Sequence, residues 1–335
     1  MAALGDDFFV QTFTATLQKY EKQLVDNVLL EHPTLELFKQ NAKSITGRGL
    51  VIPVRAKSLD STAFDTTSTG SGGFSTGISG DIMGSAVYGW AKGIITRFRV
   101  SHREILQNSG PEQIVNLVEE YVKGASADHG DFITAKLHTL SAAWDNDSFN
   151  SLDNLVGNAS SDAYYDSVNA DWLPVGGIDP NEADKDYWQA GFRGESSAAS
   201  EDIVAAFRRA TNEIYRASRK RPTHAIVGFD VYEEFEAYLA EKGNPQQLGG
   251  STIQTRFNEI KFGDLTVRLD PDCQDDRAYL LNKDSLRFAY CAGEFMKSFP
   301  AQTVVGTLDT VVPMASTITV GVSERRANGL IIRTA

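Results

Sequence analysis

The sequence is poor in cysteine and in long apolar runs. Its 335 residues include two cysteines, Cys273 and Cys291, neither of which has a partner cysteine or histidine at metal-ligand spacing. We therefore expect two reduced thiols and no zinc site. No stretch approaches the roughly 18–20 consecutive apolar residues of a membrane span, and the first residues lack the basic region of a signal peptide. These absences predict a soluble, cytosolic protein with no membrane partner.

Positive charge is also scarce. Lys and Arg number 32 against 44 Asp and Glu, which gives a formal net charge of −12 and a pI near 4.9. Neutralising phosphates requires clustered Lys and Arg, so this balance excludes tight nonspecific coating of nucleic acid but permits loose enclosure of DNA. Hydrophobic residues at 41% suffice for ordinary cores, and the length predicts one multi-lobed unit or two domains.

Motifs for catalysis are weak. The Gly-Phe-Ser-Thr-Gly run at 73–77 fits the hydrolase pattern around a nucleophile, here Ser75, but that pattern needs an apolar strand before it and a helix after it. The run lies within 61–85, a tract rich in Gly, Ser and Thr that has neither flank. The glycines of this tract also lack the Lys-Ser/Thr ending of a phosphate-binding loop. A serine hydrolase using Ser75 is therefore a remote alternative, and we predict no enzyme, no catalytic residue and no cofactor.

Patterns for metal binding are equally weak. The five histidines are scattered and form no His-Glu-x-x-His pair. Acidic runs at 145–147 and 270–276 lack the glycine and terminal Glu of a calcium-binding loop. We expect these runs to be solvated turns and predict no metal site.

The most informative region of the sequence is 50–100. Two β-type runs, at 50–56 and 94–100, enclose the tract rich in Gly, Ser and Thr. Such a tract has too few apolar residues to bury a core of its own. Folding back on its own subunit would therefore add little stability. We interpret the region as a long hairpin arm that reaches toward a neighbouring subunit.

The rest of the chain mixes helices and strands. Apolar residues recur at helical spacing through 7–30 and through 111–143, and the second segment would form a rod of roughly 45–50 Å. The segment 200–245 is typical of a helix, a strand and a second helix. From 262 onward the pattern is mostly β. This order predicts an α+β fold.

Several segments, taken in order, are similar to those of one protein family. They are the hairpin at 50–100, the long helix at 111–143, the run at 151–156, the Val-Gly-Gly-Ile-Asp run at 175–179 with Tyr187-Trp188, and the Arg-rich turn at 323–330. With these elements in order, the chain resembles the major capsid proteins of tailed double-stranded DNA bacteriophages. That family has the Hong-Kong-97-type fold, which encapsulin shells and the herpesvirus capsid floor share. The resemblance covers nearly the whole length, and the order of elements carries most of it.

The resemblance implies an α+β subunit with four parts. These are an N-terminal arm at 1–48, an extended loop at 49–100, a peripheral domain at 101–155 and about 279–335 with the spine helix 111–143, and an axial domain at about 156–278. It also implies a structural protein of the virion capsid, made and assembled in the cytoplasm of a host bacterium. Copies would form pentamers and hexamers that close into an icosahedral head around double-stranded DNA, with a portal as a further partner.

Two features differ from some members of the family. The arm pattern begins within the first ten residues, so we expect a separate scaffolding protein in place of an N-terminal scaffolding domain. In some members a Lys–Asn isopeptide bond crosslinks the subunits covalently, but residues 58–91 of this chain contain no lysine. We therefore expect noncovalent contacts or a separate cement protein to hold the shell.

Five residues are candidate intersubunit contacts: Phe74, Arg97, Arg99, Arg325 and Arg326. The arginines would pair with acidic groups on adjacent subunits, and ordinary surface arginines are the alternative interpretation. At the level of the whole protein, the alternative is an encapsulin-like nanocompartment that assembles alone around an enzyme cargo. A protein that decorates a preformed shell would seldom need both a long arm and a long spine.

Overall fold

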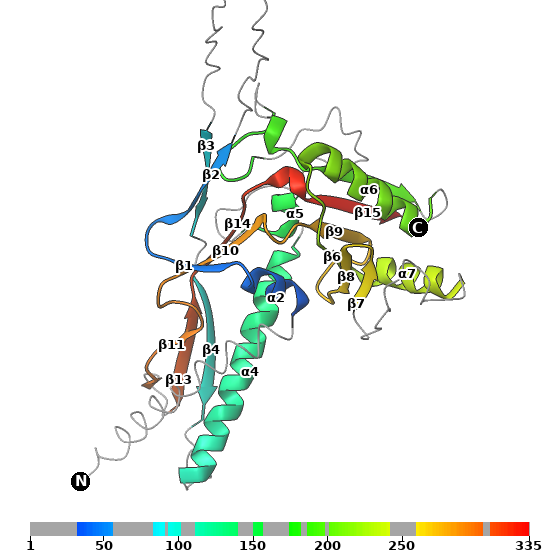
Figure 1. Cartoon of the computed structure of the whole chain (residues 1–335). Helices are drawn as coiled ribbons and strands as arrows, with labels where there is room; N and C mark the ends of the chain where they lie inside the picture. The colour runs from blue at the N-terminus through cyan, green and yellow to red at the C-terminus, as the bar shows by residue number, and fades with distance from the viewer. Residues whose placement is uncertain are drawn as a thin grey trace, which may run out of the picture.

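The computed structural model describes residues 32–55, 83–90, 93–101, 111–139, 150–156, 174–181, 186–197, 201–241, 259–303 and 309–334 (Figure 1). Its helices are α2 (Pro33–Lys39), α4 (Pro111–Leu137), α5 (Leu152–Val156), α6 (Ile203–Ser218) and α7 (Phe229–Glu241), with short 3-10 helices η1 (Asp186–Trp188) and η2 (Arg325–Ala327). Its strands are β1 (Ala42–Ile45), β2 (Gly49–Arg55), β3 (Met83–Gly89), β4 (Ile94–Val100), β5 (Phe192–Ser197), β6 (His224–Val227), β7 (Glu259–Phe262), β8 (Leu265–Leu269), β9 (Arg277–Leu281), β10 (Leu286–Cys291), β11 (Lys297–Ser298), β12 (Gln302–Thr303), β13 (Thr310–Ser316), β14 (Ile318–Val322) and β15 (Gly329–Thr334). The predicted α+β class is confirmed.

Some predictions concern segments outside the described residues. They are the arm helix at 7–30, the tip of the hairpin, which includes Phe74 and Ser75, and the acidic run at 145–147. Within the described part of the chain, no helix is both long and apolar enough to cross a membrane. Cys273 is buried, Cys291 is partly buried, and both are free thiols.

The long hairpin is made of β2 and β3. These strands pair antiparallel from Gly49 opposite Gly89 to Arg55 opposite Met83. The prediction that the run at 94–100 closes the hairpin is therefore wrong. That run is β4, which pairs antiparallel with β13 in another sheet because its buried apolar face packs against α4.

The helix α4 is a rod of 27 residues, about 40 Å long at 1.5 Å per residue, that lies along β4 (Figure 1). Gly124 and Gly130 each cost about 1 kcal/mol relative to Ala but do not interrupt it. The helix ends at Leu137, several residues earlier than predicted. The next side chain, His138, is held by buried hydrogen bonds, and the Thr139 N–H donates to a carbonyl only three residues back, which closes the last turn.

A mixed sheet of six strands, in the order β5-β15-β9-β6-β8-β7, forms the lobe on the right of Figure 1. β15 pairs parallel with β5, and β6 pairs parallel with β8, whereas the other neighbours are antiparallel. α6 packs on β5, β15 and α7, and the rings of Phe207 and Phe235 meet edge to face at 4.7 Å between the two helices. The predicted order of helix, strand and helix at 200–245 is confirmed by α6, β6 and α7.

The sequence of α6 explains its position and its end. Its buried face repeats at helical spacing and consists of Ile203, Phe207, Ala210 and Ile214. The helix ends at Ser218 because Arg219 takes a left-handed backbone conformation with φ 58°, and Pro222 follows. An apolar face at this spacing holds α6 on the six-stranded sheet, with its arginines on the outside.

Two smaller sheets connect the hairpin to α4. One has the order β1-β10-β14, and the other has the order β11-β13-β12 with β4 on the far side of β13. β12, which ends at Thr303, pairs antiparallel with the start of β13 at Thr310 and Val311. The larger apolar core joins the hairpin, α2, the end of α4, α5, β10 and β14, and a second core lies between the six-stranded sheet and its two helices.

Candidate functional site

The β2–β3 hairpin has one buried face and one exposed face. The buried face consists of Leu50, Ile52, Val54, Ala86 and Tyr88, each exposed by 8% or less. On the other face Val51 and Val87 lie directly opposite each other and are 60% and 48% exposed. Pro53 is the next exposed residue along β2. We call Val51, Pro53 and Val87 the outer hairpin face.

Tyr88 fixes the buried face of the hairpin to β14. Its ring lies over Gly321, where an added Cβ would come within 2.7 Å of the ring carbons. Its hydroxyl donates to the carbonyl of Val322 at 2.9 Å and accepts the Val322 N–H at 3.2 Å. Burial raises the pKa of Tyr88 well above its ordinary value, so the phenol stays protonated and remains a donor.

The turn at Gly176 and Gly177 lies against the hairpin. The two glycines have φ of +63° and +77°, a left-handed conformation that favours glycine. The carbonyl of Gly176 accepts the Val87 N–H at 2.8 Å. A Cβ on Gly176 would lie 3.0 Å from the Ala86 Cβ and 3.1 Å from the Tyr88 ring. The glycine therefore permits a close approach between this turn and β3.

Arg325 is a buried cation that binds backbone carbonyls. Its guanidinium is 0% exposed and donates to the carbonyls of Leu155 at 3.0 Å, Asn154 at 3.2 Å and Trp188 at 3.2 Å. The first two carbonyls end α5, where the partial negative charge of a helix terminus favours a cation. Burial lowers the pKa of Arg325 to about 10, which leaves it protonated at neutral pH.

These contacts form one continuous group, which we call the hairpin-base cluster and define as Tyr88, Gly176, Trp188 and Arg325. Trp188 connects its two halves, because its indole N–H donates to the carbonyl of Val175 at 2.9 Å while its own carbonyl accepts from Arg325. The structure thus brings together the glycine pair, the aromatic pair and the Arg-rich turn, which are far apart in the sequence. They hold the base of the hairpin in one orientation.

The candidate intersubunit arginines are placed differently from one another. Arg325 lies inside the subunit, so the prediction that it contacts a neighbouring subunit is wrong. Arg326 beside it is partly buried. Arg97 and Arg99 lie on the exposed face of β4, where Arg99 pairs with Asp309 of the same chain. Contacts of these three arginines with other subunits stay predictions.

A buried histidine joins α4 to the sheet beside it. His129 is 0% exposed, with its Nδ1 2.7 Å from the Thr96 Oγ1 of β4 and its Nε2 2.8 Å from the Ser316 Oγ of β13. Since a hydroxyl can either donate or accept, a neutral imidazole is satisfied on both sides. Burial lowers the pKa of His129 to about 4. The scattered histidines of the sequence gave no sign of this contact.

This histidine predicts a dependence of stability on pH. The folded-state pKa of His129 lies below its ordinary value of 6.5, so the unfolded chain binds the proton more readily. The stability from the neutral imidazole is complete above pH 6.5 and is lost as the pH falls toward 4. Between pH 7.5 and 4.5, His129→Gln should lose about 2–3 kcal/mol less unfolding free energy than the wild type. Urea denaturation at both pH values measures this; equal losses in the two proteins would refute it.

A second buried polar group joins α2, the end of α4 and the loop after β8. Asp270 is 0% exposed and accepts the Thr34 hydroxyl, and its Oδ2 lies 3.4 Å from the Nε2 of His138. Burial raises the pKa of Asp270, but hydrogen bonds from His138 and Thr34 outweigh it and hold that pKa below its ordinary value. The prediction of a solvated turn at 270–276 is therefore wrong at Asp270. Thr34 and Asp270 both approach the same nitrogen of His138, so the group is a junction between elements and lacks the arrangement of a nucleophile, base and acid.

Metal ligands do not gather in the described part of the chain, where no group of three or more histidine, cysteine or acidic side chains is placed to hold an ion. No protein-family model matches the sequence, and no curated protein matches it.

Solved capsid structures share the fold of this chain. The capsid of Cyanophage A-1(L) is 15% identical, with a TM-score of 0.62 over 90% of this chain and 92% of that one. The capsid of a native GTA particle is 11% identical, with a TM-score of 0.51 over 89% and 90% of the two chains. The capsid of Cyanophage P-SCSP1u is 9% identical, with a TM-score of 0.50 over 88% and 86%. The chain therefore has the Hong-Kong-97-type fold of phage capsid proteins over most of its length.

Proposed function

We propose that this chain is a major capsid protein whose copies form pentamers and hexamers and close into an icosahedral phage head around double-stranded DNA. The observation that carries the proposal is the hairpin. The hairpin-base cluster fixes the hairpin at one end, while the outer hairpin face leaves an opposed valine pair in solvent. A ribbon whose inner face is packed and whose outer face exposes an opposed apolar pair suits a role in which a neighbouring subunit covers the outer face.

The rest of the molecule supports the two further domains that a capsid subunit of this kind requires. α4 with β4 and β13 would be the spine of a peripheral domain. The six-stranded sheet with α6 and α7 would be an axial domain, and it would include β15 from the segment that the resemblance assigns to the peripheral domain. A net charge of −12 suits loose enclosure of DNA, because repulsion leaves the packaged polymer free to move. The further partners would be a separate scaffolding protein, a portal and a cement protein. The protein would be located in the virion capsid and would assemble in the host cytoplasm.

The outer hairpin face gives a direct prediction. The double variant Val51→Glu/Val87→Lys makes this face polar but keeps an attractive cross-strand pair, so the hairpin itself should persist. If the two valines are buried between subunits, the yield of assembled particles should fall by about tenfold or more, since losing about 1.4 kcal/mol per contact has that effect. Sedimentation velocity measures the yield, and thermal unfolding of the unassembled subunit should be nearly unchanged.

The matched control for this prediction is Val51→Ile/Val87→Ile, which keeps the face apolar and should assemble like the wild type. A double variant of opposite charges that still assembles fully would show that this face is not a subunit contact. The function itself is tested by electron microscopy of the purified protein with and without candidate scaffolding proteins. Closed shells that need a scaffold support a phage head, whereas shells that form alone around a protein cargo would indicate a nanocompartment.

A further inference from the structure

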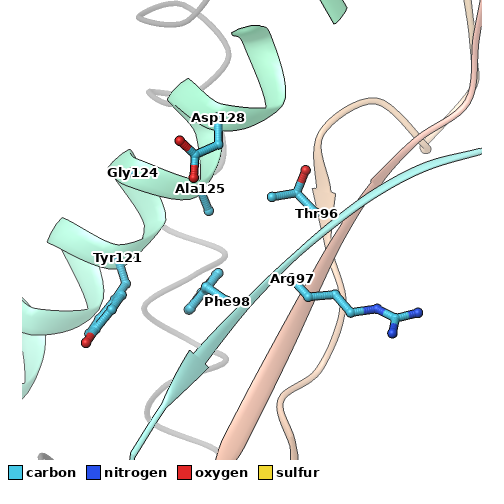
Figure 2. Close-up of a pocket in the computed structure, with 7 residues that line it drawn as sticks. All are labelled: Thr96, Arg97, Phe98, Tyr121, Gly124, Ala125 and Asp128. Carbon is cyan, nitrogen blue, oxygen red and sulfur yellow. The ribbon is translucent and has the colours of Figure 1, made fainter. Parts of the chain in front are cut away.

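A groove of about 430 Å³ lies between α4 and β4, away from the hairpin-base cluster. Figure 2 shows that Phe98 projects from β4 toward the helix while Tyr121 and Ala125 face the strand from α4. The rings of Phe98 and Tyr121 are parallel, with centroids 6.2 Å apart. Arg97 points to the opposite side of the strand (Figure 2). The groove therefore presents aromatic and small apolar surface between a helix and a strand, with Thr96 and Asp128 adding polar groups to its lining.

The described chain begins next to this groove. Its first residue, His32, places its Nε2 3.0 Å from the Oδ1 of Asp131 on α4. Asp131 lies three residues after Asp128, which lines the groove, and this separation is about 5 Å along a helix. Residues before His32 therefore leave from the surface of α4 within about one helical turn of the groove.

The residues before His32 have the pattern that such a groove would accept. Apolar side chains recur at spacings of 4, 4, 3, 4 and 4 and are Phe9, Phe13, Leu17, Tyr20, Leu24 and Val28. A single apolar stripe of this kind gains stability only when it packs on a partner surface. If such a helix packed along α4, the equal rise of 1.5 Å per residue would bring its last apolar residues beside the groove.

We propose that the groove between α4 and β4 is the docking site for the apolar face of residues 7–30 of the same chain. The attachment at His32 makes this segment an intramolecular ligand with a high effective concentration at the groove. The proposal concerns the single subunit and does not depend on shell formation. In the unassembled subunit, residues 7–30 would lie against α4 of their own chain.

Gly124 provides a test that leaves the fold intact. It lines the groove on an exposed part of α4, and an added Cβ there would meet no atom within 4 Å. Alanine at this helical position also removes the cost of glycine, about 1 kcal/mol, and tryptophan removes part of it. Gly124→Trp should therefore fill the groove without unfolding the helix, and Gly124→Ala is the matched control that leaves the groove open.

The experiment follows tryptic cleavage after Lys19 and Lys22 by mass spectrometry, using the full-length chain as an unassembled subunit. Cleavage should be slow in the wild type and in Gly124→Ala, and faster by about tenfold or more in Gly124→Trp, because proteolysis tracks the population of the undocked segment. Circular dichroism should show equal or higher melting temperatures for both variants.

Three results would overturn the proposal. Equal fast cleavage in all three proteins would mean that the segment does not dock. Equal slow cleavage would mean that it docks elsewhere. Protection that rises with protein concentration would mean that the segment binds another copy. Electron microscopy of the same variants reports shell formation separately, so failure of docking and failure of the capsid proposal are distinguishable.

Discussion

Replacing Arg325 with alanine should lower the free energy of unfolding by about 3–5 kcal/mol, the largest loss expected from a single side chain outside the apolar core. The guanidinium is 0% exposed and binds the carbonyls of Asn154, Leu155 and Trp188. Its removal leaves these carbonyls buried without that donor and creates a cavity at the end of α5. Urea denaturation at pH 7.5 measures the loss.

The neighbouring arginine provides the control. Arg326 is partly exposed, so Arg326→Ala should cost less than about 1 kcal/mol. Arg325→Met keeps most of the volume but removes the donors, so its cost should fall between the two alanine variants. A loss below about 1 kcal/mol in Arg325→Ala would contradict the role of this residue as the centre of the hairpin-base cluster.

Gly176→Val should destabilise the protein by about 2–5 kcal/mol and loosen the hairpin. A β-branched residue is strained at φ +63°, at a cost of about 1–2 kcal/mol, and its side chain overpacks the site at a cost of about 1–3 kcal/mol. Its Cβ would lie 3.0 Å from the Ala86 Cβ and 3.1 Å from the Tyr88 ring. Hydrogen exchange should show faster exchange of the Val87 amide, which donates to the Gly176 carbonyl.

The adjacent glycine separates strain from contact. Gly177 has φ +77°, but an added Cβ would meet no atom within 4 Å, so Gly177→Ala should cost about 1 kcal/mol and leave the Val87 amide protected. Equal effects at the two positions would show that the close approach between the turn and β3 contributes nothing. The pair of variants thus tests how the hairpin is held, independently of what it contacts.

Elements with a strong local pattern were predictable from the sequence. The repeat of Ile203, Phe207, Ala210 and Ile214 placed α6 correctly, and the periodicity after Pro111 predicted the spine helix α4 with only its end misplaced. The order of these elements also pointed to the capsid fold that the solved structures share. Local periodicity survives in the fold because each of these elements buries a single apolar face.

Features that depend on distant contacts were not predictable. The strand β3, with the sequence Met-Gly-Ser-Ala-Val-Tyr-Gly, has few β-branched residues, so its pairing with β2 could not be distinguished from loop composition. The local sequence predicts that Arg325 is exposed, because nothing near it in the sequence indicates that α5 and Trp188 enclose it. His129 meets Ser316 across 187 positions, a separation at which a single sequence carries no periodic signal.

We propose that this chain is a shell subunit whose outer hairpin face lies against a neighbouring subunit. A cryo-electron microscopy reconstruction of the assembled particle, prepared with its scaffolding protein where one is needed, tests it most directly. We predict a closed icosahedral shell of pentamers and hexamers in which Val51 and Val87 are buried between subunits. A protein that stays strictly monomeric under every condition would contradict the claim.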